Sequence, residues 1–204
     1  MIDMAYLGES GQIPFMAKAE ITKRVEEVLD ECWDGEYPIN IEGICDYLGI
    51  VLLPVKDLAK DFQVEAFLAA DFKTILVDEY GYRRESYRYR FSVAHELGHC
   101  VLHRDYYSSR VESYEEWLGL SQSANNGYAE FQANYFAGSL LVPEEELVGM
   151  LNMKFDGSMA RHYWWVGREE LERIMREVRE FFKVSEQVVK RRMDEMVYGL
   201  EVSG

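Results

Sequence analysis

The sequence predicts an α+β fold, in which a small antiparallel three-stranded sheet packs on one histidine-bearing helix and on further helices. Segments suited to strands occur only between residues 50 and 79, where short apolar runs are bounded by turn-forming residues. Apolar residues recur at helical spacing before and after that region. The chain has 204 residues and no internal repeat, so it can form one fair-sized domain with a small helical appendage.

The first half of the chain supplies a pair of helices and the sheet. A helix is predicted over 17–31, because Ile21, Val25, Val28 and Leu29 form an apolar stripe. A short helix follows, capped by Asn40 and ending at Gly49. The strand over 50–55 and a hairpin over about 62–79 then form the sheet.

The middle of the chain is predicted to return to helices. After a connection over 79–85, residues 86–103 form a helix. The segment 104–127 has no clean period, and we interpret it as an excursion or mobile loop. A further helix covers 128–141. Pro143 and the three glutamates after it are typical of the first turn of the next helix.

The C-terminal part is predicted to be helical and to resemble a helix-turn-helix arrangement. Apolar residues mark one long helix over 171–182 and a last helix that begins after Ser185, a candidate cap. We therefore divide the chain into a flexible N-terminal arm (1–15), a main domain (16–152) and a helical C-terminal subdomain (153–204).

Composition limits the classes of function. The 37 acidic and 22 basic residues give a formal charge of −15, which favours a basic partner over nucleic acid. The three cysteines show no metal-knuckle spacing, which is typical of a reducing compartment. The chain shows no signal peptide and no apolar run long enough to cross a membrane. We expect a soluble cytoplasmic protein that does not bind membranes.

The segment RYRFSVAHELGHCVLH (88–103) contains the pattern HExxH. On a helix, His95 and His99 stand on one face, where two imidazoles can bind one Zn²⁺. Glu96 lies beside them and can take a proton from a zinc-bound water. Histidines at this spacing can also line a wet helix face. The small and apolar neighbours favour the metal, because burying these groups with nothing to bind them would be costly.

A catalytic zinc needs a third protein ligand and an open position. His103 would lie roughly 12 Å from His95 along a straight helix, too far to share one ion, so we expect it to support a ligand or to pack. Glu130 is the better candidate, because Asn134 shares its helix face and can bond the free nitrogen of a ligand histidine. The alternative is that Glu130 is a solvated acid at a helix start. The fallback ligands are Glu115 and Glu116.

The HExxH segment and the later pattern ExxANxFAxxLLxP (130–143) together resemble the ImmA/IrrE family of metallopeptidases. The resemblance covers roughly residues 20–200. It implies one Zn²⁺ per chain, with His95, His99 and Glu130 as ligands. Glu96 would be the catalytic base. It also implies a substrate: a helix-turn-helix transcriptional repressor, which is cut so that the genes it silences are expressed in stress, mobile-element or phage-defence responses.

Peptide hydrolysis also needs a substrate-binding edge and a donor to the oxyanion. The hairpin strand over 63–70 could hold the substrate as an added strand, if it forms the sheet edge beside the zinc. The candidate oxyanion donors are Tyr128, Tyr135 and His162.

Three further hypotheses concern regulation and the class of function. The basic residues Lys190, Arg191 and Arg192 suggest contact with single-stranded DNA as an activator. A cysteine, Cys32 or Cys45, could occupy the open zinc position in a latent state, whereas Cys100 points away from the ligands. The rival to an enzyme is a non-catalytic, zinc-stabilised module that binds a repressor or antitoxin. A structural zinc usually has four protein ligands, and three are found here.

Overall fold

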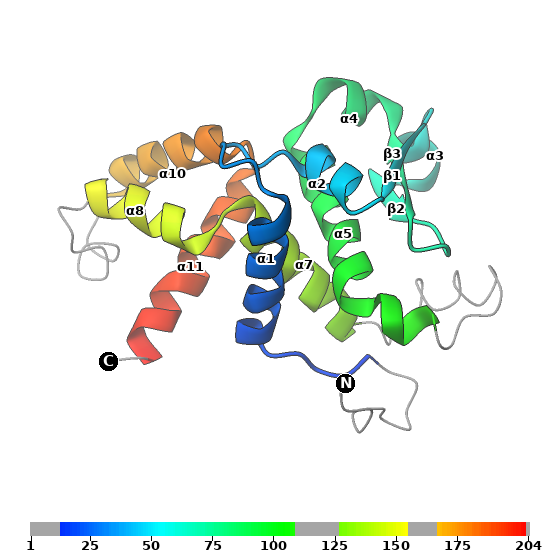
Figure 1. The fold of residues 1–204 in the computed structure, drawn as a ribbon. Coiled ribbons are helices and arrows are strands. Elements are labelled where there is room, and N and C mark those ends of the chain that lie inside the picture. The colour runs from blue at the N-terminus through cyan, green and yellow to red at the C-terminus, as the bar shows by residue number, and fades with distance from the viewer. Residues whose placement is uncertain (1–12, 109–126, 155–166, 203–204) are drawn as a thin grey trace.

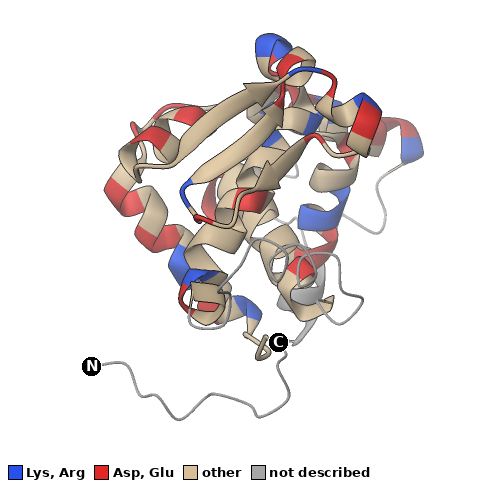
Figure 2. Cartoon of the chain, turned by 90° about the vertical axis from the view of Figure 1, so that its right-hand side faces the viewer, with Lys and Arg blue, Asp and Glu red and all other residues tan. Residues whose placement is uncertain are grey.

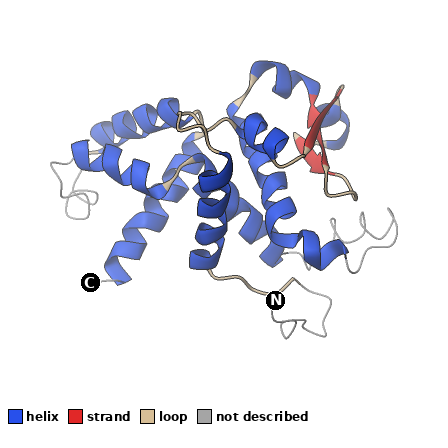
Figure 3. Ribbon diagram, in the orientation of Figure 1, coloured by secondary structure: helices blue, strands red, loops and turns tan. Residues whose placement is uncertain are grey.

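The computed structural model describes residues 13–108, 127–154 and 167–202, and it is mixed α and β as predicted (Figure 1). A small sheet lies at one end of the molecule (Figure 3). The central helices are α1 (Lys18–Cys32), α5 (Tyr87–Ser108) and α7 (Gly127–Leu141). The helices at the end away from the sheet are α8 (Glu144–Lys154), α10 (Arg168–Phe182) and α11 (Glu186–Val202).

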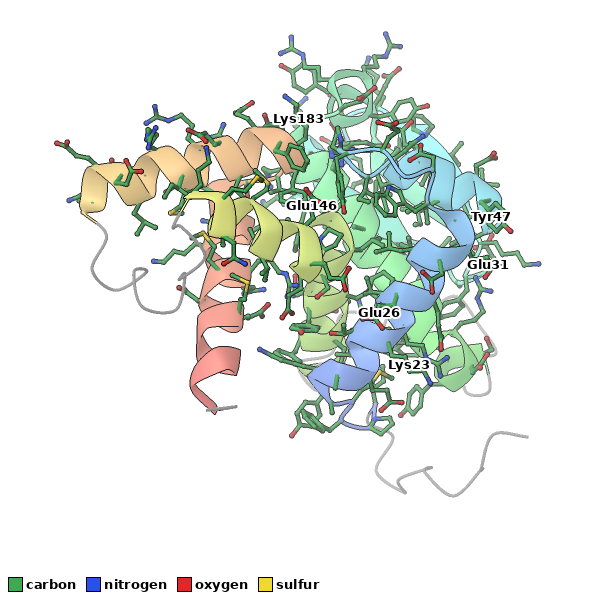
Figure 4. All side chains as sticks on the ribbon, turned by 60° about the vertical axis from the view of Figure 1, so that its left-hand side comes forward. Lys23, Glu26, Glu31, Tyr47, Glu146 and Lys183 are labelled. Carbon is green, nitrogen blue, oxygen red and sulfur yellow. The ribbon has the colours of Figure 1, made fainter. Side chains whose placement is uncertain are left out.

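Helix α1 forms because one face of its sequence is apolar. The buried face consists of Ile21, Val25 and Val28. Each such side chain contributes about 1.5–3 kcal/mol by leaving water. The outer face, turned toward the viewer in Figure 4, carries Lys23, Glu26 and Glu31. The predicted helix over 17–31 is thus confirmed.

Helix α2 (Ile41–Tyr47) begins and ends as the sequence predicts. The Oδ1 atom of Asn40 accepts a hydrogen bond from Gly43 N at 3.0 Å, which satisfies one free amide of the first turn. After the helix, Gly49 has φ +69°, in the left-handed region where glycine carries little strain. Both ends are therefore fixed by local sequence.

The sheet is mixed, and the prediction of a wholly antiparallel sheet is wrong. The strands are β1 (Val51–Val55), β2 (Ala66–Leu68) and β3 (Thr74–Asp78), in the order β1-β3-β2. The predicted hairpin is confirmed, because β2 and β3 are antiparallel, with Phe67 opposite Leu76. However, β1 and β3 are parallel. The chain crosses from β1 to the far edge before the hairpin returns β3 to the middle, so β3 runs in the direction of β1.

Two short helices lie where the sequence predicted only strand and connection. Helix α3 (Leu58–Phe62) forms part of the crossover between β1 and β2. Helix α4 (Glu79–Arg84) occupies the predicted connection and is capped by Asp78, which accepts from Gly81 N at 3.1 Å. Helices of one or two turns carry too few apolar repeats to show a period, so the sequence pattern missed them.

Helices α5 and α7 pack closely at Gly98. A Cβ atom added there would lie 3.2 Å from Ala133 Cα and 3.1 Å from Phe136 Cδ1, so only glycine fits without a shift. Helix α5 also extends five residues past the predicted end, to Ser108. The remainder of the predicted excursion, 109–126, lies outside the described residues.

The apolar core continues from the sheet to the C-terminal helices. Ile75 of β3 and Leu97 of α5 belong to one buried cluster with Phe182 of α10 and Met193 of α11. Ile13, within the predicted arm, is also buried in this cluster. The division at residue 152 stays a prediction. Among the described helices, none has the length and apolar character needed to cross a membrane. Acidic residues are spread over the helices and loops around the sheet (Figure 2).

Candidate metal centre

Three side chains from α5 and α7 meet at one point. His95 and His99 stand one turn apart on α5, and Glu130 comes from the first turn of α7. The Nε2 atom of His95 lies 3.3 Å from Glu130 Oε2, and that of His99 lies 3.4 Å from Glu130 Oε1. The two Nε2 atoms are 3.1 Å apart. The structure therefore brings together the three residues predicted as ligands.

The spacing of these atoms fits a zinc-sized tetrahedron. Ligand atoms about 2.0–2.1 Å from a tetrahedral zinc are about 3.3 Å from each other. The three separations in the cluster, between 3.1 and 3.4 Å, agree with that edge length. Two imidazoles and one carboxylate are also the ligand set of several catalytic zinc sites. The residues present thus suit a metal ion with one further position open.

A line of hydrogen bonds supports His99 through Nδ1, the ring nitrogen that does not face the cluster. Its Nδ1 atom lies 3.0 Å from His103 Nδ1, and His103 Nε2 lies 2.8 Å from Gln132 Oε1. The Gln132 Nε2 atom donates to the carbonyl of Pro14 at 2.9 Å. His103 therefore contacts the predicted ligand His99 and lies outside the cluster, in the supporting position that helix geometry favours.

The Pro14 carbonyl sets the direction of this whole line. A carbonyl can only accept, so the Gln132 amide nitrogen faces it and the amide oxygen faces His103. His103 must then donate from Nε2 and accept at Nδ1, and His99 donates from its own Nδ1. The Nε2 atom of His99 consequently presents its lone pair to the cluster. Burial, together with the neighbouring His99, lowers the pKa of His103 to about 3, so His103 is neutral as the line requires.

Sequence reasoning missed Gln132 and the role of Pro14. Gln132 is fully buried, and its neighbours Phe131 and Ala133 belong to a largely apolar helix. A glutamine in that setting needs partners, because burying an unpaired amide is costly. That polar residue within an apolar helix was the available signal. Its partner Pro14 is 118 residues away, and no local pattern indicates it.

Asn134 holds the other two ligands together. Its Nδ2 atom donates to the Glu130 backbone carbonyl at 2.7 Å, and its side chain also hydrogen-bonds to His95. Burial alone would lower the pKa of His95, but the bonds to Glu130 and Asn134 and the charge of Glu96 outweigh it and raise that pKa. The contacts with His95 and His99 hold the pKa of Glu130 well below its usual range.

Glu96 lies beside the cluster and against the sheet. Its Oε2 atom accepts a hydrogen bond from Leu68 N at 3.0 Å, which connects the carboxylate to the edge strand β2. Burial raises the pKa of Glu96, although His99 and His95 act in the opposite direction. A carboxyl group with a raised pKa beside a metal site is suited to accept and return a proton.

The predicted oxyanion donors have different placements. Tyr128 is half-exposed on α7, two residues before Glu130, and packs edge-on against Phe15. The hydroxyl of Tyr135 lies 3.4 Å from Thr22 Oγ1 of α1. The role of each tyrosine as an oxyanion donor stays a prediction. Three further predicted residues lie outside the described ranges. They are the donor candidate His162 and the fallback ligands Glu115 and Glu116.

The cysteine thiols and the basic residues 190–192 do not belong to the metal centre. Cys45 and Cys100 are buried and free, and burial raises the pKa of each thiol to about 12. The cluster contains no thiol, so the structure gives no support to a cysteine in the open position. Arg192 is also buried, with Nε 3.3 Å from the Val142 carbonyl, and is therefore not part of an exposed basic surface.

Comparison with known proteins agrees with this geometry. The model of the Peptidase_M78 family, described as the IrrE N-terminal-like domain, matches residues 45–194. The chain belongs to this family. The match includes all three cluster residues and Glu96. The family shows a metallopeptidase of the ImmA/IrrE type, and the His-His-Glu cluster is compatible with a metal ion at its centre. No curated protein matches the chain.

Proposed function

We propose that the protein is a zinc-dependent endopeptidase that cleaves a helix-turn-helix transcriptional repressor and so relieves repression. The observation that carries the proposal is the cluster of His95, His99 and Glu130 with Glu96 beside it. The spacing of the three ligand atoms suits tetrahedral zinc. The family supports a peptidase, and the repressor as substrate rests on the resemblance to ImmA/IrrE proteins.

The residues have separate tasks in this proposal. A zinc ion held by the cluster would polarise the scissile carbonyl and make a water acidic enough to attack it. Glu96 takes the proton of the attacking water and delivers it to the leaving amine. The hydrogen bond from Leu68 N keeps the Glu96 carboxylate oriented during this transfer. Asn134 and His103 hold the ligand imidazoles in place.

The outer edge of β2 is suited to hold the substrate. Backbone bonds join Glu65 to Asp78 and Ala69 to Thr74, so alternate residues of β2 face β3. The backbone groups of Ala66 therefore point away from β3, toward the outer edge. An extended peptide can add to that edge as a further strand. Because Leu68 N contacts Glu96, such a strand would pass beside the proposed base.

The setting of the reaction follows from the proposed substrate. A repressor acts in the cytoplasm, and the three free thiols are typical of that reducing compartment. Single-stranded DNA remains a proposed activator. Of the basic run 190–192, Lys190 and Arg191 are exposed and could contact the DNA, whereas Arg192 is buried.

The direct test uses the repressor encoded beside this gene, incubated with the zinc-loaded protein. Cleavage is expected, and a chelator should abolish it. Glu96→Gln should keep zinc but lose about 10²–10⁴-fold in rate, the usual contribution of a general base. Full activity of Glu96→Gln would remove Glu96 as the base. Tight repressor binding by the zinc-loaded wild type without any cleavage would favour the non-catalytic module instead.

A further inference from the structure

A groove extends toward the C-terminal helices from Asn134, the residue that hydrogen-bonds to His95 of the metal centre. It has a volume of about 830 Å³ and lies between α5, α7 and the first turns of α11. We call it the arginine groove and define it by Arg88, Ser92, Asn134, Gly138, Arg191 and Glu195, which line it.

Helical spacing joins this groove to the metal centre. On α5, Arg88, Ser92 and His95 follow one another at intervals of four and three residues, so they share a face. On α7, Glu130, Asn134 and Gly138 share a face in the same way. Arg88, Ser92, Asn134 and Gly138 of these faces line the groove, and the same faces continue past it to the metal cluster. Seven residues of helix span about 10 Å, the length of about three residues of extended chain.

Arg192 holds the α11 wall of the groove firmly against α7. The Arg192 side chain crosses Gly138, where an added Cβ would lie 3.3 Å from Arg192 Cδ. Its guanidinium bonds to the Val142 carbonyl and to Glu195 and lies over the Tyr135 ring. Arg192 thus fixes α11 against α7, and it leaves Arg191, the preceding residue, facing outward.

The groove carries an excess of positive charge in an acidic molecule. Among its described lining residues the one carboxylate is that of Glu195, which is shared by Lys18 at 3.6 Å and Arg192 at 3.0 Å. Arg191 is exposed, and none of the ion pairs among the described residues involves it. Arg88 is also exposed, and its one ion pair with a described residue is with Glu65 at 3.4 Å. The whole chain has a charge of −15, so this local excess is the reverse of the overall field.

We propose that the arginine groove binds the substrate polypeptide on one side of the scissile bond and selects an acidic side chain about three residues from the cut. Arg88 and Arg191 are the two cations that would contact its carboxylate. This assignment rests on the proposed peptidase function. A phosphate backbone is the less suitable occupant, because nucleic-acid binding normally uses many more cations than these two.

The test is a cleavage profile. The zinc-loaded protein is incubated with a mixed peptide library, and the products are sequenced by mass spectrometry. We expect Asp or Glu to be enriched about three residues from the cut. Arg191→Glu and Arg88→Glu should shift the preference toward Lys or Arg and raise KM for acidic peptides about tenfold, with kcat unchanged. Lys23→Glu, the same charge change on the outer face of α1, should keep the wild-type profile.

The outcomes separate this proposal from the peptidase function itself. Cleavage with no acidic preference, or with a preference that both arginine variants keep, would overturn the groove assignment and leave the peptidase intact. If no library peptide is cut, binding to zinc-loaded Glu96→Gln decides. Matched peptides with Asp or Lys at one position should then differ about tenfold in affinity, and Arg191→Glu should reverse the order. Equal affinities for the two matched peptides would refute the groove assignment. An Arg191→Glu variant that loses affinity only for single-stranded DNA would refute it as well.

Discussion

The Nδ1 atoms of His99 and His103 lie 3.0 Å apart, and this contact directs the other nitrogen of His99 toward the metal cluster. The orientation begins at Gln132, which is held between His103 and the Pro14 carbonyl. Gln132→Met removes the acceptor while keeping most of the volume. We expect zinc affinity, measured by competition with a chelator, to fall about 10–100-fold.

Two comparisons distinguish this effect from general loss of packing. Gln132→Glu keeps an acceptor for His103 but loses the amide donor to the Pro14 carbonyl, so its zinc affinity should fall less than that of Gln132→Met. Ser139→Ala changes another buried polar side chain of α7, whose hydroxyl has no hydrogen-bond partner among the described residues, and should not alter zinc binding. In the wild type, nitrogen NMR should report His99 protonated at Nδ1. Unchanged zinc affinity in Gln132→Met would show that this line does not orient the ligand.

The outer edge of β2 can be tested with proline. Ala66 is the first residue of the strand, and its amide points away from β3. Ala66→Pro should therefore preserve the fold but remove a donor to an added substrate strand, so KM should rise. Phe67→Pro is the contrast. The backbone of residue 67 faces β3, so the loss of its amide should weaken the sheet and lower the melting temperature. Unaltered kinetics in a folded Ala66→Pro variant would mean that substrate does not pair with this edge.

Alanine substitutions at two helical glycines should change the free energy of unfolding in opposite directions, because Gly98 lies at the α5–α7 contact and Gly149 has free space around it. Gly98→Ala brings a Cβ within 3.2 Å of Ala133 Cα, and we expect a loss of about 1–3 kcal/mol in the free energy of unfolding. Gly149→Ala, in α8, meets nothing within 4 Å and should stabilise by about 0.5–1 kcal/mol through helix propensity. Denaturant unfolding measures both. Equal stability of the two variants would contradict the packing described here.

Asp78 predicts a pH-dependent contribution to stability. Its hydrogen bond from Ala59 N, with a second from Gly81 N, lowers its pKa below the ordinary value. A group with a depressed folded pKa stabilises fully above its unfolded pKa of about 3.9, and that contribution is lost as pH falls through the folded value. Asp78→Asn should cost about 1–3 kcal/mol near pH 7 and progressively less below pH 4. Asp46→Asn, at an exposed site of α2, should show no such difference.

Local patterns predicted the parts of the molecule that depend on neighbours in the sequence. The caps at Asn40 and Ser185 and the shared face of His95 and His99 follow from helix geometry alone. Glu130 was predicted as a carboxylate that shares a face with Asn134. The parallel pairing of β1 was missed, because it depends on how the crossover through α3 returns the chain.

Contacts between distant segments were beyond sequence reasoning. The bond between Gln132 and Pro14 joins residues 118 positions apart. Arg192 belongs to a basic run in the sequence, yet it is buried against the Val142 carbonyl, 50 residues away. The Tyr135 hydroxyl lies 3.4 Å from Thr22 Oγ1, 113 residues away in the sequence. In each case a partner from another helix or segment determines the direction of the side chain.

The central claim is that one zinc ion is bound by two imidazoles and the Glu130 carboxylate. X-ray absorption at the zinc edge of the loaded protein tests it most directly. We predict four nitrogen or oxygen neighbours at about 2.0–2.1 Å, two of them imidazoles, with one metal per chain and weaker binding in Glu130→Gln. A sulfur neighbour at about 2.3 Å, or an unchanged spectrum and affinity in Glu130→Gln, would contradict the account.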